Sequence, residues 1–126
     1  MNIGIFTQCY LPILNGVVVA IESFRKGLEQ LGHNVYIFAP AYEGYKDASL
    51  KVFRLAALKS PFQPYYPIAL LPSVKILTKL SELNLDIVHT HHPFVIGKLG
   101  ARLAKRLHIP LIFTYHTLLE KYTHYV

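Results

Sequence analysis

The chain has 126 residues, of which 52% are apolar and 16% charged, and it carries 13 Lys and Arg against 7 Asp and Glu. This balance fits one globular domain with a sizeable core and excludes an intrinsically disordered chain. The single cysteine, Cys9, excludes an internal disulfide and a cystine-stabilised secreted scaffold, and it favours a reducing compartment.

No side chain from Met1 to Ile21 is charged, so a leader peptide and a membrane span have to be considered. A signal peptide needs a basic segment before its apolar core, and none is present. A membrane span would have to bury Asn2, Gln8 and Asn15, which is costly in hydrocarbon. We therefore expect a buried strand, a polar turn and the start of a helix here.

The first half of the chain predicts a strand, a helix and a second strand. Asn2–Thr7 is a short apolar run, typical of a strand buried on both faces. In Val17–Leu31 apolar residues recur at helical spacing, and Gly32 follows as a C-terminal stop. Val35–Ala39 predicts the second strand. The expected apolar face of the helix is Val18, Ile21, Phe24, Leu28 and Leu31, and its expected ion pairs are Glu22/Lys26 and Arg25/Glu29.

The middle of the chain predicts a third strand, a long loop and a second helix. Lys51–Leu55 is the candidate strand. Ser60–Val74 contains four prolines, which exclude a continuous helix or a central strand, so we expect an apolar loop. Ser73 is a candidate N-cap of the helix that follows. The expected apolar face of that helix is Ile76, Leu77, Leu80 and Leu83.

The remaining elements are a strand at Asp86–Thr90, a helix at Phe94–Leu107 and a strand at Leu111–Tyr115. Strands that alternate with helices form a parallel sheet with right-handed crossovers. The predicted fold class is therefore α/β, a single Rossmann-like domain over residues 1–126 with a doubly wound parallel sheet of about five strands.

Ligands of such sheets bind beyond the carboxyl ends of the strands, near the point where the strand order reverses. This rule selects three loops, Gln8–Gly16, His91–Pro93 and His116–Glu120, and the polar and histidine-rich residues fall in them. In the first loop, Asn15-Gly16 precedes a helix whose amino-terminal amides attract anions such as phosphate. An Asn-Gly turn required only by chain geometry explains the pair equally well. The dinucleotide fingerprint G-x-G-x-x-G is absent.

Four histidines gather at the ends of the fourth and fifth predicted strands, namely His89, His91, His92 and His116. They could bind a metal, act as a general acid or base, or donate hydrogen bonds to a polar ligand. No acidic residue lies between Asp86 and Glu120, which disfavours a metal site. A metal-dependent hydrolase nevertheless stays open as a rival function. Alternatively, His89 and His91 are satisfied strand-end residues, and this interpretation fits His89 better than His91.

The second half of the chain is basic: residues 48–119 carry nine basic and two acidic side chains. We expect an anionic partner there. The candidate residues are Lys75, Lys79, Lys98, Arg102, Lys105 and Arg106. Next to the loop residues Phe62, Tyr65, Tyr66 and Leu70 they are typical of a surface that lies on an anionic membrane, although such a stripe is usually only solvated. No nucleic-acid-binding module is recognisable. A non-catalytic module that binds membrane or phosphate is a second rival function.

Three segments carry a resemblance to a known family. They are IGIFT from Ile3 with YLPILNGVV from Tyr10, DIVHTHHPF from Asp86, and TYHTLLEKYTHY from Thr114. In this order they resemble the start of family 4 retaining glycosyltransferases, and within that family the branch that transfers glucose to diacylglycerol. The likeness covers nearly the whole chain.

The resemblance implies the GT-B fold, two Rossmann-like domains that face each other across a cleft. It implies an amino-terminal domain that binds a lipid acceptor and lies peripherally on the cytoplasmic face of an anionic membrane. A carboxy-terminal domain would bind a nucleotide sugar such as UDP-glucose, with no metal or cofactor. This chain matches only the amino-terminal domain and lacks the donor-binding one, so we expect it to be inactive by itself.

The resemblance also implies roles for single residues. Asn15-Gly16 matches the loop that approaches the donor diphosphate, and His116 matches the catalytic histidine near the transferred sugar. The expected contacts to acceptor or sugar are His91, Glu120, Tyr122 and His124. Gln8 stands where an acidic residue is common in the family, and the first loop has one glycine where many members have two.

Overall fold

The computed structural model describes residues 1–59, 67–70, 72, 74–93 and 95–116, with the backbone alone at residues 74 and 75. Its centre is a sheet of five parallel strands in the order β3-β2-β1-β6-β7. The strands are β1 (Asn2–Phe6), β2 (Asn34–Pro40), β3 (Val52–Leu55), β6 (Ile87–Thr90) and β7 (Leu111–Phe113). The predicted α/β class and parallel sheet are confirmed.

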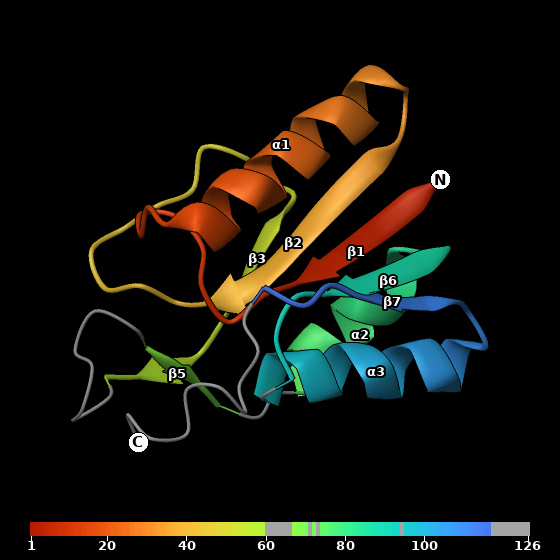
Figure 1. Cartoon of the computed structure of the whole chain (residues 1–126). Coiled ribbons are helices and arrows are strands. Elements are labelled where there is room, and N and C mark those ends of the chain that lie inside the picture. The colour runs from red at the N-terminus through yellow and green to blue at the C-terminus, as the bar shows by residue number, and fades with distance from the viewer. Residues whose placement is uncertain (60–66, 71, 73, 94, 117–126) are drawn as a thin grey trace.

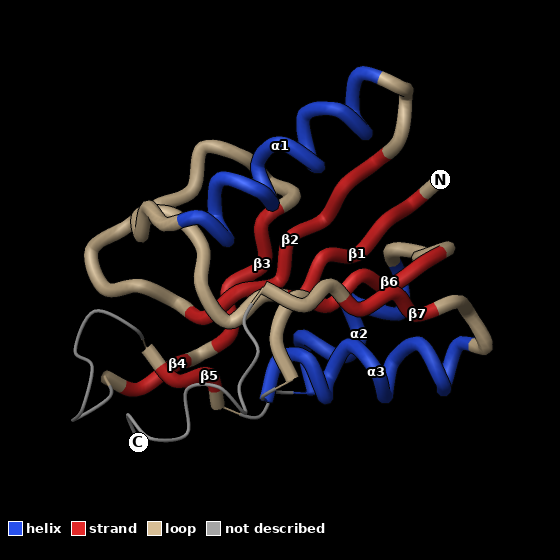
Figure 2. Tube along the Cα trace, in the orientation of Figure 1, coloured by secondary structure: helices blue, strands red, loops and turns tan. Residues whose placement is uncertain are grey.

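Helices cover both faces of this sheet (Figures 1 and 2). Helix α1 (Gly16–Gln30) packs on one face, and α2 (Val74–Glu82) and α3 (Val95–Leu107) pack on the other. Along β1, Ile5 belongs to the core under α1 and Phe6 to the core under α2 and α3. Because successive strand residues face opposite sides and both sides are covered, the strand sequence is a continuous apolar run.

Local sequence signals set the ends of α1. The Asn15 side-chain oxygen accepts a hydrogen bond from the Val18 amide at 2.9 Å and caps the first turn. Gly32 has φ +91°, and the Gly32 and His33 amides donate to the carbonyls of Glu29 and Leu28. This is the Schellman arrangement, so the expected glycine stop is confirmed.

Two expectations for the sides of α1 were wrong. Phe24 and Leu31 are 43% and 75% exposed, because the buried stripe of this helix is narrower and centred on Val18 and Ile21. Glu22 pairs with Arg25 at 2.8 Å instead of with Lys26. The predicted partner of Arg25, Glu29, is also in place at 2.9 Å, so one guanidinium bridges both carboxylates.

The middle segment contains more structure than expected. Strand β4 (Ala57–Leu58) pairs antiparallel with β5 (Ile68–Ala69), which lies inside the predicted loop. The prolines still exclude a long strand, since β5 has two residues. Leu80 is buried in the core as predicted, whereas the Leu77 side chain is exposed. The expected N-cap Ser73 lies outside the described residues.

The last predicted strand is shorter than expected, because β7 ends at Phe113 and not at Tyr115. All three β7 residues are exposed, although all three are large and apolar. In the described part of the chain, no helix has the length and apolar content that a bilayer crossing requires.

Candidate functional site

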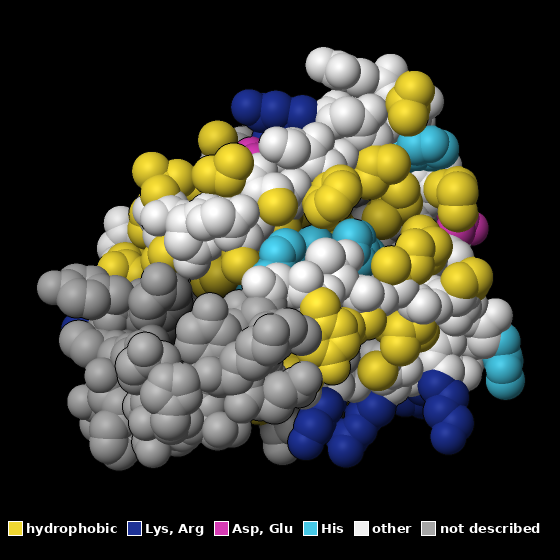
Figure 3. Space-filling view, in the orientation of Figure 1, with side chains coloured by type: hydrophobic (Ala, Val, Ile, Leu, Met, Phe, Trp, Pro, Cys, Tyr) yellow, Lys and Arg dark blue, Asp and Glu magenta, His cyan; other side chains and the backbone are white. Residues whose placement is uncertain are grey.

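The sheet order places one candidate site beside β1. This strand lies between β2 and β6, so the chain winds in opposite directions on its two sides. The loops that follow β1, β6 and β7 therefore meet at one edge of the sheet. Figure 3 shows histidine side chains (cyan) at the surface between hydrophobic side chains on this face.

His91 and His116 form the central contact of the site. Their Nδ1 and Nε2 atoms lie 2.7 Å apart, and their rings are stacked with centroids 5.0 Å apart. His91 is only 2% exposed. Burial, and secondly the neighbouring histidines, lower the pKa of His91 to about 3, so its ring is neutral at physiological pH. His116 uses Nε2 for this contact, and its Nδ1 has no hydrogen-bond partner among the described residues.

His92 joins the histidines to the loop that follows β1. Its Nδ1 accepts a hydrogen bond from the Gln8 amide at 3.1 Å, and the Thr7 hydroxyl lies 3.5 Å from the same atom. The pKa of His92 is lowered to about 4, mainly by burial. Its neutral ring therefore carries the proton on Nε2.

Among the four histidines, His89 contacts Thr114 and packs between two aromatic rings. Its Nε2 lies 2.6 Å from the Thr114 hydroxyl, and its ring packs between Phe24 and His91, with centroids 5.7 and 4.1 Å away. Burial lowers its pKa as well. The expectation that His89 and His91 share one side of the strand is confirmed, and His89 has the surroundings of a packed strand-end residue.

The first loop presents an exposed helix terminus. The Asn15 side chain caps α1 and lies 3.6 Å from the Cys9 sulfur, so it is occupied within the protein. Gly16 is exposed, its φ is outside the left-handed region, and a Cβ there would meet no atom within 4 Å. Chain geometry therefore does not require glycine at this position, which removes the basis of the turn interpretation.

A metal centre gains no support from this arrangement. Among the described residues, no group of three or more His, Cys, Asp or Glu side chains is placed to hold a metal ion. Three of the histidines direct a nitrogen at another protein group: His89 at Thr114, His91 at His116 and His92 at Gln8.

An apolar groove that also has basic side chains in its lining lies on the other side of the sheet. It has a volume of about 480 Å³ and an apolar lining from β3, α2 and α3 that includes Leu55, Leu77, Leu99 and Leu103. Lys98, Arg102 and Arg106 of α3 also line it. Figure 3 shows Lys and Arg side chains (dark blue) gathered along the lower edge of the molecule, over α3. Lys79 and Lys105 are exposed as expected.

Comparisons with known proteins identify the family to which this chain belongs. The sequence profile of Glycosyltransferase Family 4 matches residues 14–126. The chain belongs to this family. An alpha-monoglucosyldiacylglycerol synthase from Acholeplasma laidlawii is 40% identical over 128 residues, covering 100% of this chain and 32% of that protein. The synthase of the same name from Streptococcus pneumoniae is 35% identical and is covered over 29% of its length.

Two further known proteins also match this chain over only about a third of their own length. A GDP-mannose-dependent alpha-mannosyltransferase from Corynebacterium glutamicum is 31% identical over 93% of this chain and 29% of its own length. The sucrose-phosphate synthase structure from Thermosynechococcus elongatus superposes with a TM-score of 0.61 and 14% identity, covering 96% of this chain and 34% of that one. This glycosyltransferase family member thus spans about a third of the length of the relatives it matches. The superposition shows that its fold is shared with a GT-B enzyme.

Several predicted site residues lie outside the described residues. These are the expected acceptor or sugar contacts Glu120, Tyr122 and His124, and the loop aromatics Phe62, Tyr65 and Tyr66. The Lys75 side chain is likewise not described. His91 is described: it is buried, and its Nδ1 contacts His116.

Sequence reasoning selected the first loop, which includes Gln8, but it missed Thr7, Thr114 and Phe24 as members of the site. Thr7 and Gln8 contact His92, Thr114 contacts His89, and Phe24 covers the histidine rings. Position gives a signal for two of them, because Thr7 follows β1 directly and Thr114 follows β7 directly. No sequence signal marks Phe24, which belongs to the apolar repeat of α1.

Proposed function

We propose that this chain is the amino-terminal part of a retaining glycosyltransferase that moves a hexose, glucose first of all, from a nucleotide sugar to a lipid acceptor such as diacylglycerol. The observation that carries the proposal is His116, held at the switch point of the sheet by the buried, neutral ring of His91. The names of the two synthases that match the whole chain support the choice of glucose and diacylglycerol.

In this proposal the donor diphosphate lies against the amino terminus of α1. The geometry of an α-helix leaves the Gly16 and Val17 amides without intrahelical partners, and α1 has no acidic residue in its first turn. Amides fixed in this way stabilise the negative charge that develops on a departing diphosphate. The missing side chain of Gly16 lets the phosphate reach the backbone.

His116 then contacts the transferred sugar near the reaction centre. Its free Nδ1 offers a polar group to the sugar, while the acceptor hydroxyl attacks from the face that the diphosphate leaves, so the anomeric configuration is retained. The proposed acceptor or sugar contacts also include Glu120, Tyr122 and His124. His91 acts here by fixing the ring of His116.

The lipid acceptor suggests that the protein works at a membrane surface. We propose that the anionic membrane contacts α3, where its lipid phosphates would meet Lys98, Arg102, Lys105 and Arg106. Lys75 and Lys79 of α2 would extend it. The apolar groove between α2 and α3 supports this choice, because apolar surface next to basic side chains matches the interface of an anionic bilayer. The protein would lie peripherally on the cytoplasmic face.

The donor-binding domain would lie outside these 126 residues, so we expect the isolated chain to be inactive. The first measurement is the intact mass of the native gene product in its source cell. A mass near 40 kDa or above is too large for one ordinary domain and supports the proposal. A mass that matches 126 residues means that catalysis requires a separate partner chain.

The decisive assay supplies the native gene product with UDP-glucose and vesicles that contain diacylglycerol, with GDP-mannose as the alternative donor. We expect a monoglycosyl lipid with retained anomeric configuration, and none from the isolated chain. Binding to anionic vesicles without transfer from either donor would contradict the proposal and favour a non-catalytic membrane module.

A further inference from the structure

Arg54, near the end of β3, joins three segments of the chain. Its side chain is 16% exposed and pairs with both carboxylate oxygens of Asp47, at 2.8 and 2.9 Å. It also donates to the Pro40 carbonyl at 2.9 Å and to the Leu11 carbonyl. One guanidinium thus connects the end of β2, the segment before β3 and the loop that follows β1.

Two aromatic rings complete the surroundings of Arg54. Its guanidinium lies over the rings of Tyr10 and Tyr45, 5.5 and 5.4 Å from their centroids. A planar cation between aromatic faces gains stabilisation that an ammonium group does not reproduce. Because four of its N–H directions are already used and the side chain is largely buried, Arg54 is not placed to touch a ligand itself.

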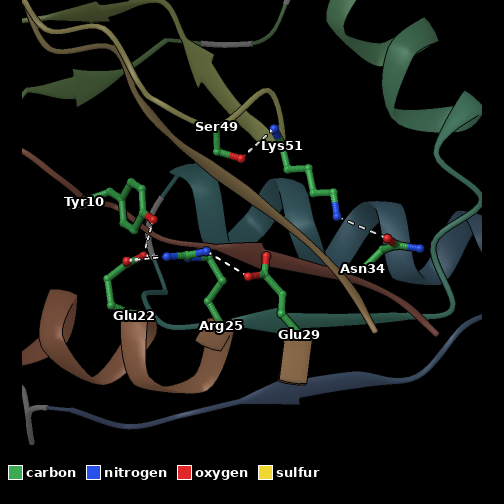
Figure 4. A network of polar contacts seen from close by, with 7 residues as sticks. All are labelled: Tyr10, Glu22, Arg25, Glu29, Asn34, Ser49 and Lys51. Atoms are coloured by element: carbon green, nitrogen blue, oxygen red, sulfur yellow. Dashed lines mark hydrogen bonds and ion pairs between the residues drawn. The ribbon is translucent and has the colours of Figure 1, made fainter. Parts of the chain in front are cut away.

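Tyr10 carries this connection on to α1. Its ring contacts Arg54, and its hydroxyl donates to the Glu22 carboxylate. Glu22 in turn pairs with Arg25 (Figure 4). Burial and the hydrogen bond to Glu22 raise the pKa of Tyr10, so the hydroxyl keeps its proton. The first loop is therefore held from β3 on one side and from the body of α1 on the other.

The same loop touches both parts of the candidate site. Its Gln8 amide contacts His92, and it ends at Asn15 and Gly16. We propose that Arg54 is a positioning residue of the transferase: by holding the Leu11 carbonyl and the Tyr10 ring, it fixes the first loop in the geometry that receives the donor diphosphate. This inference rests on the proposed function, and nothing in the sequence motifs pointed to Arg54.

The test uses the native gene product with Arg54→Ala, Arg54→Lys and Tyr10→Phe. The matched control is Lys59→Ala, which removes an exposed cation paired with Glu43 at 2.9 Å. The Kd of UDP and of GDP is measured by calorimetry, and KM for donor and for acceptor, together with kcat, is measured by assay. Circular dichroism establishes that each variant is folded.

We expect Arg54→Ala to raise the Kd of the bound nucleotide and the donor KM about tenfold or more, with the acceptor KM within twofold of wild type. Arg54→Lys should show a smaller loss of nucleotide binding than Arg54→Ala, because lysine keeps the positive charge but not the planar guanidinium with its fixed N–H donors. Tyr10→Phe keeps the ring over Arg54 and should raise the donor KM by a smaller factor. Lys59→Ala should match wild type. If Arg54→Ala fails to fold, Arg54→Lys and Tyr10→Phe decide the question.

Equal changes in donor and acceptor KM, or unchanged nucleotide binding in the folded Arg54 variants, would overturn the proposal. Gly16→Ala separates this failure from a failure of the proposed function. Weaker nucleotide binding in Gly16→Ala with normal binding in the Arg54 variants rejects only the positioning role. Normal nucleotide binding in Gly16→Ala rejects the donor loop itself, and the role of Arg54 with it.

Discussion

The Nδ1 atom of His91 lies 2.7 Å from the Nε2 atom of His116, although 25 residues separate the two in sequence. The contact forms because β6 and β7 are parallel neighbours, so the residues that follow them leave the sheet at the same edge. His91 is buried and neutral, and it holds His116 without adding charge. The buried imidazole therefore occupies the Nε2 atom of His116 and fixes the orientation of its ring.

Replacement of His116 tests its catalytic role. In the native gene product, His116→Ala should lower kcat about 100-fold or more, because a positioned polar group at a reaction centre typically contributes that much. The control is His33→Ala, since His33 precedes β2 at the opposite edge of the sheet. Steady-state kinetics of both variants give the comparison, and unchanged turnover in His116→Ala would remove this residue from the site.

The neutral histidines predict a pH-dependent stability. In the folded protein the pKa values of His91 and His92 are about 3 and about 4, below the ordinary 6.5. Between about pH 6.5 and 4 the unfolded chain therefore binds protons that the folded chain does not. The free energy of unfolding should fall as the pH falls through this window, by about 1.4 kcal/mol per pH unit for each histidine.

Urea unfolding between pH 7.5 and 5 measures this slope. The lowered pKa of Glu22 affects stability at lower pH and leaves this range unaffected. His91→Gln should reduce the slope. A stability that is constant from pH 7 to 5 would show that the histidines titrate normally in the folded state.

Replacement by alanine should change the stability of the fold in opposite directions at two glycines, Gly97 and Gly27. A Cβ at Gly97 would overlap the His92 carbonyl oxygen, whereas a Cβ at Gly27 in α1 would meet no atom within 4 Å. Gly97→Ala should therefore destabilise the fold by about 1–3 kcal/mol and displace the His92 loop. Gly27→Ala should stabilise it by about 0.5–1 kcal/mol through helix propensity. Thermal unfolding of both variants measures whether each change in stability is positive or negative. A stabilised Gly97→Ala protein would disprove the close contact.

Gly16→Ala separates folding from ligand binding. Because a methyl group there has open space, the free energy of unfolding should stay the same or rise by up to about 1 kcal/mol. Donor binding should nevertheless weaken about tenfold, since the methyl group keeps the diphosphate from the backbone. Calorimetric titration with UDP and GDP measures the second effect. Stability and affinity that fall together would mean that Gly16 serves the fold.

The basic side chains of α3 predict salt-dependent membrane binding. Each Lys or Arg near an anionic surface contributes about 1 kcal/mol, so Arg102→Gln with Arg106→Gln should lower vesicle partitioning roughly 30-fold. The matched control changes Lys26 and Lys46, two exposed cations outside α3. Sedimentation with phosphatidylglycerol vesicles at low and high salt measures the loss. Equal partitioning of the two double variants would place the membrane surface elsewhere.

Local signals in the sequence were sufficient for the helices and for the strands of the parallel sheet, but not for the short strands β4 and β5. Apolar runs of strand length indicated strands covered on both faces, and Gly32 marked the carboxyl end of α1. These signals act over a few residues, through capping hydrogen bonds and backbone conformation, so they can be recognised without knowing the fold. The alternation of strands and helices then indicated a parallel sheet and the edge that carries the site.

The contacts within the site depended on tertiary structure. Gln8 meets His92 across 84 residues because β1 lies beside β6, and Phe24 covers histidine rings because α1 packs over that edge. Arg54 finds the Leu11 carbonyl only once β3 has joined the sheet beyond β2. Such pairs combine ordinary residue types at large separations, so no local pattern reports them. The sequence by itself therefore determined the helices, the strands of the parallel sheet and the family motifs, and the strand order decided which of these residues touch.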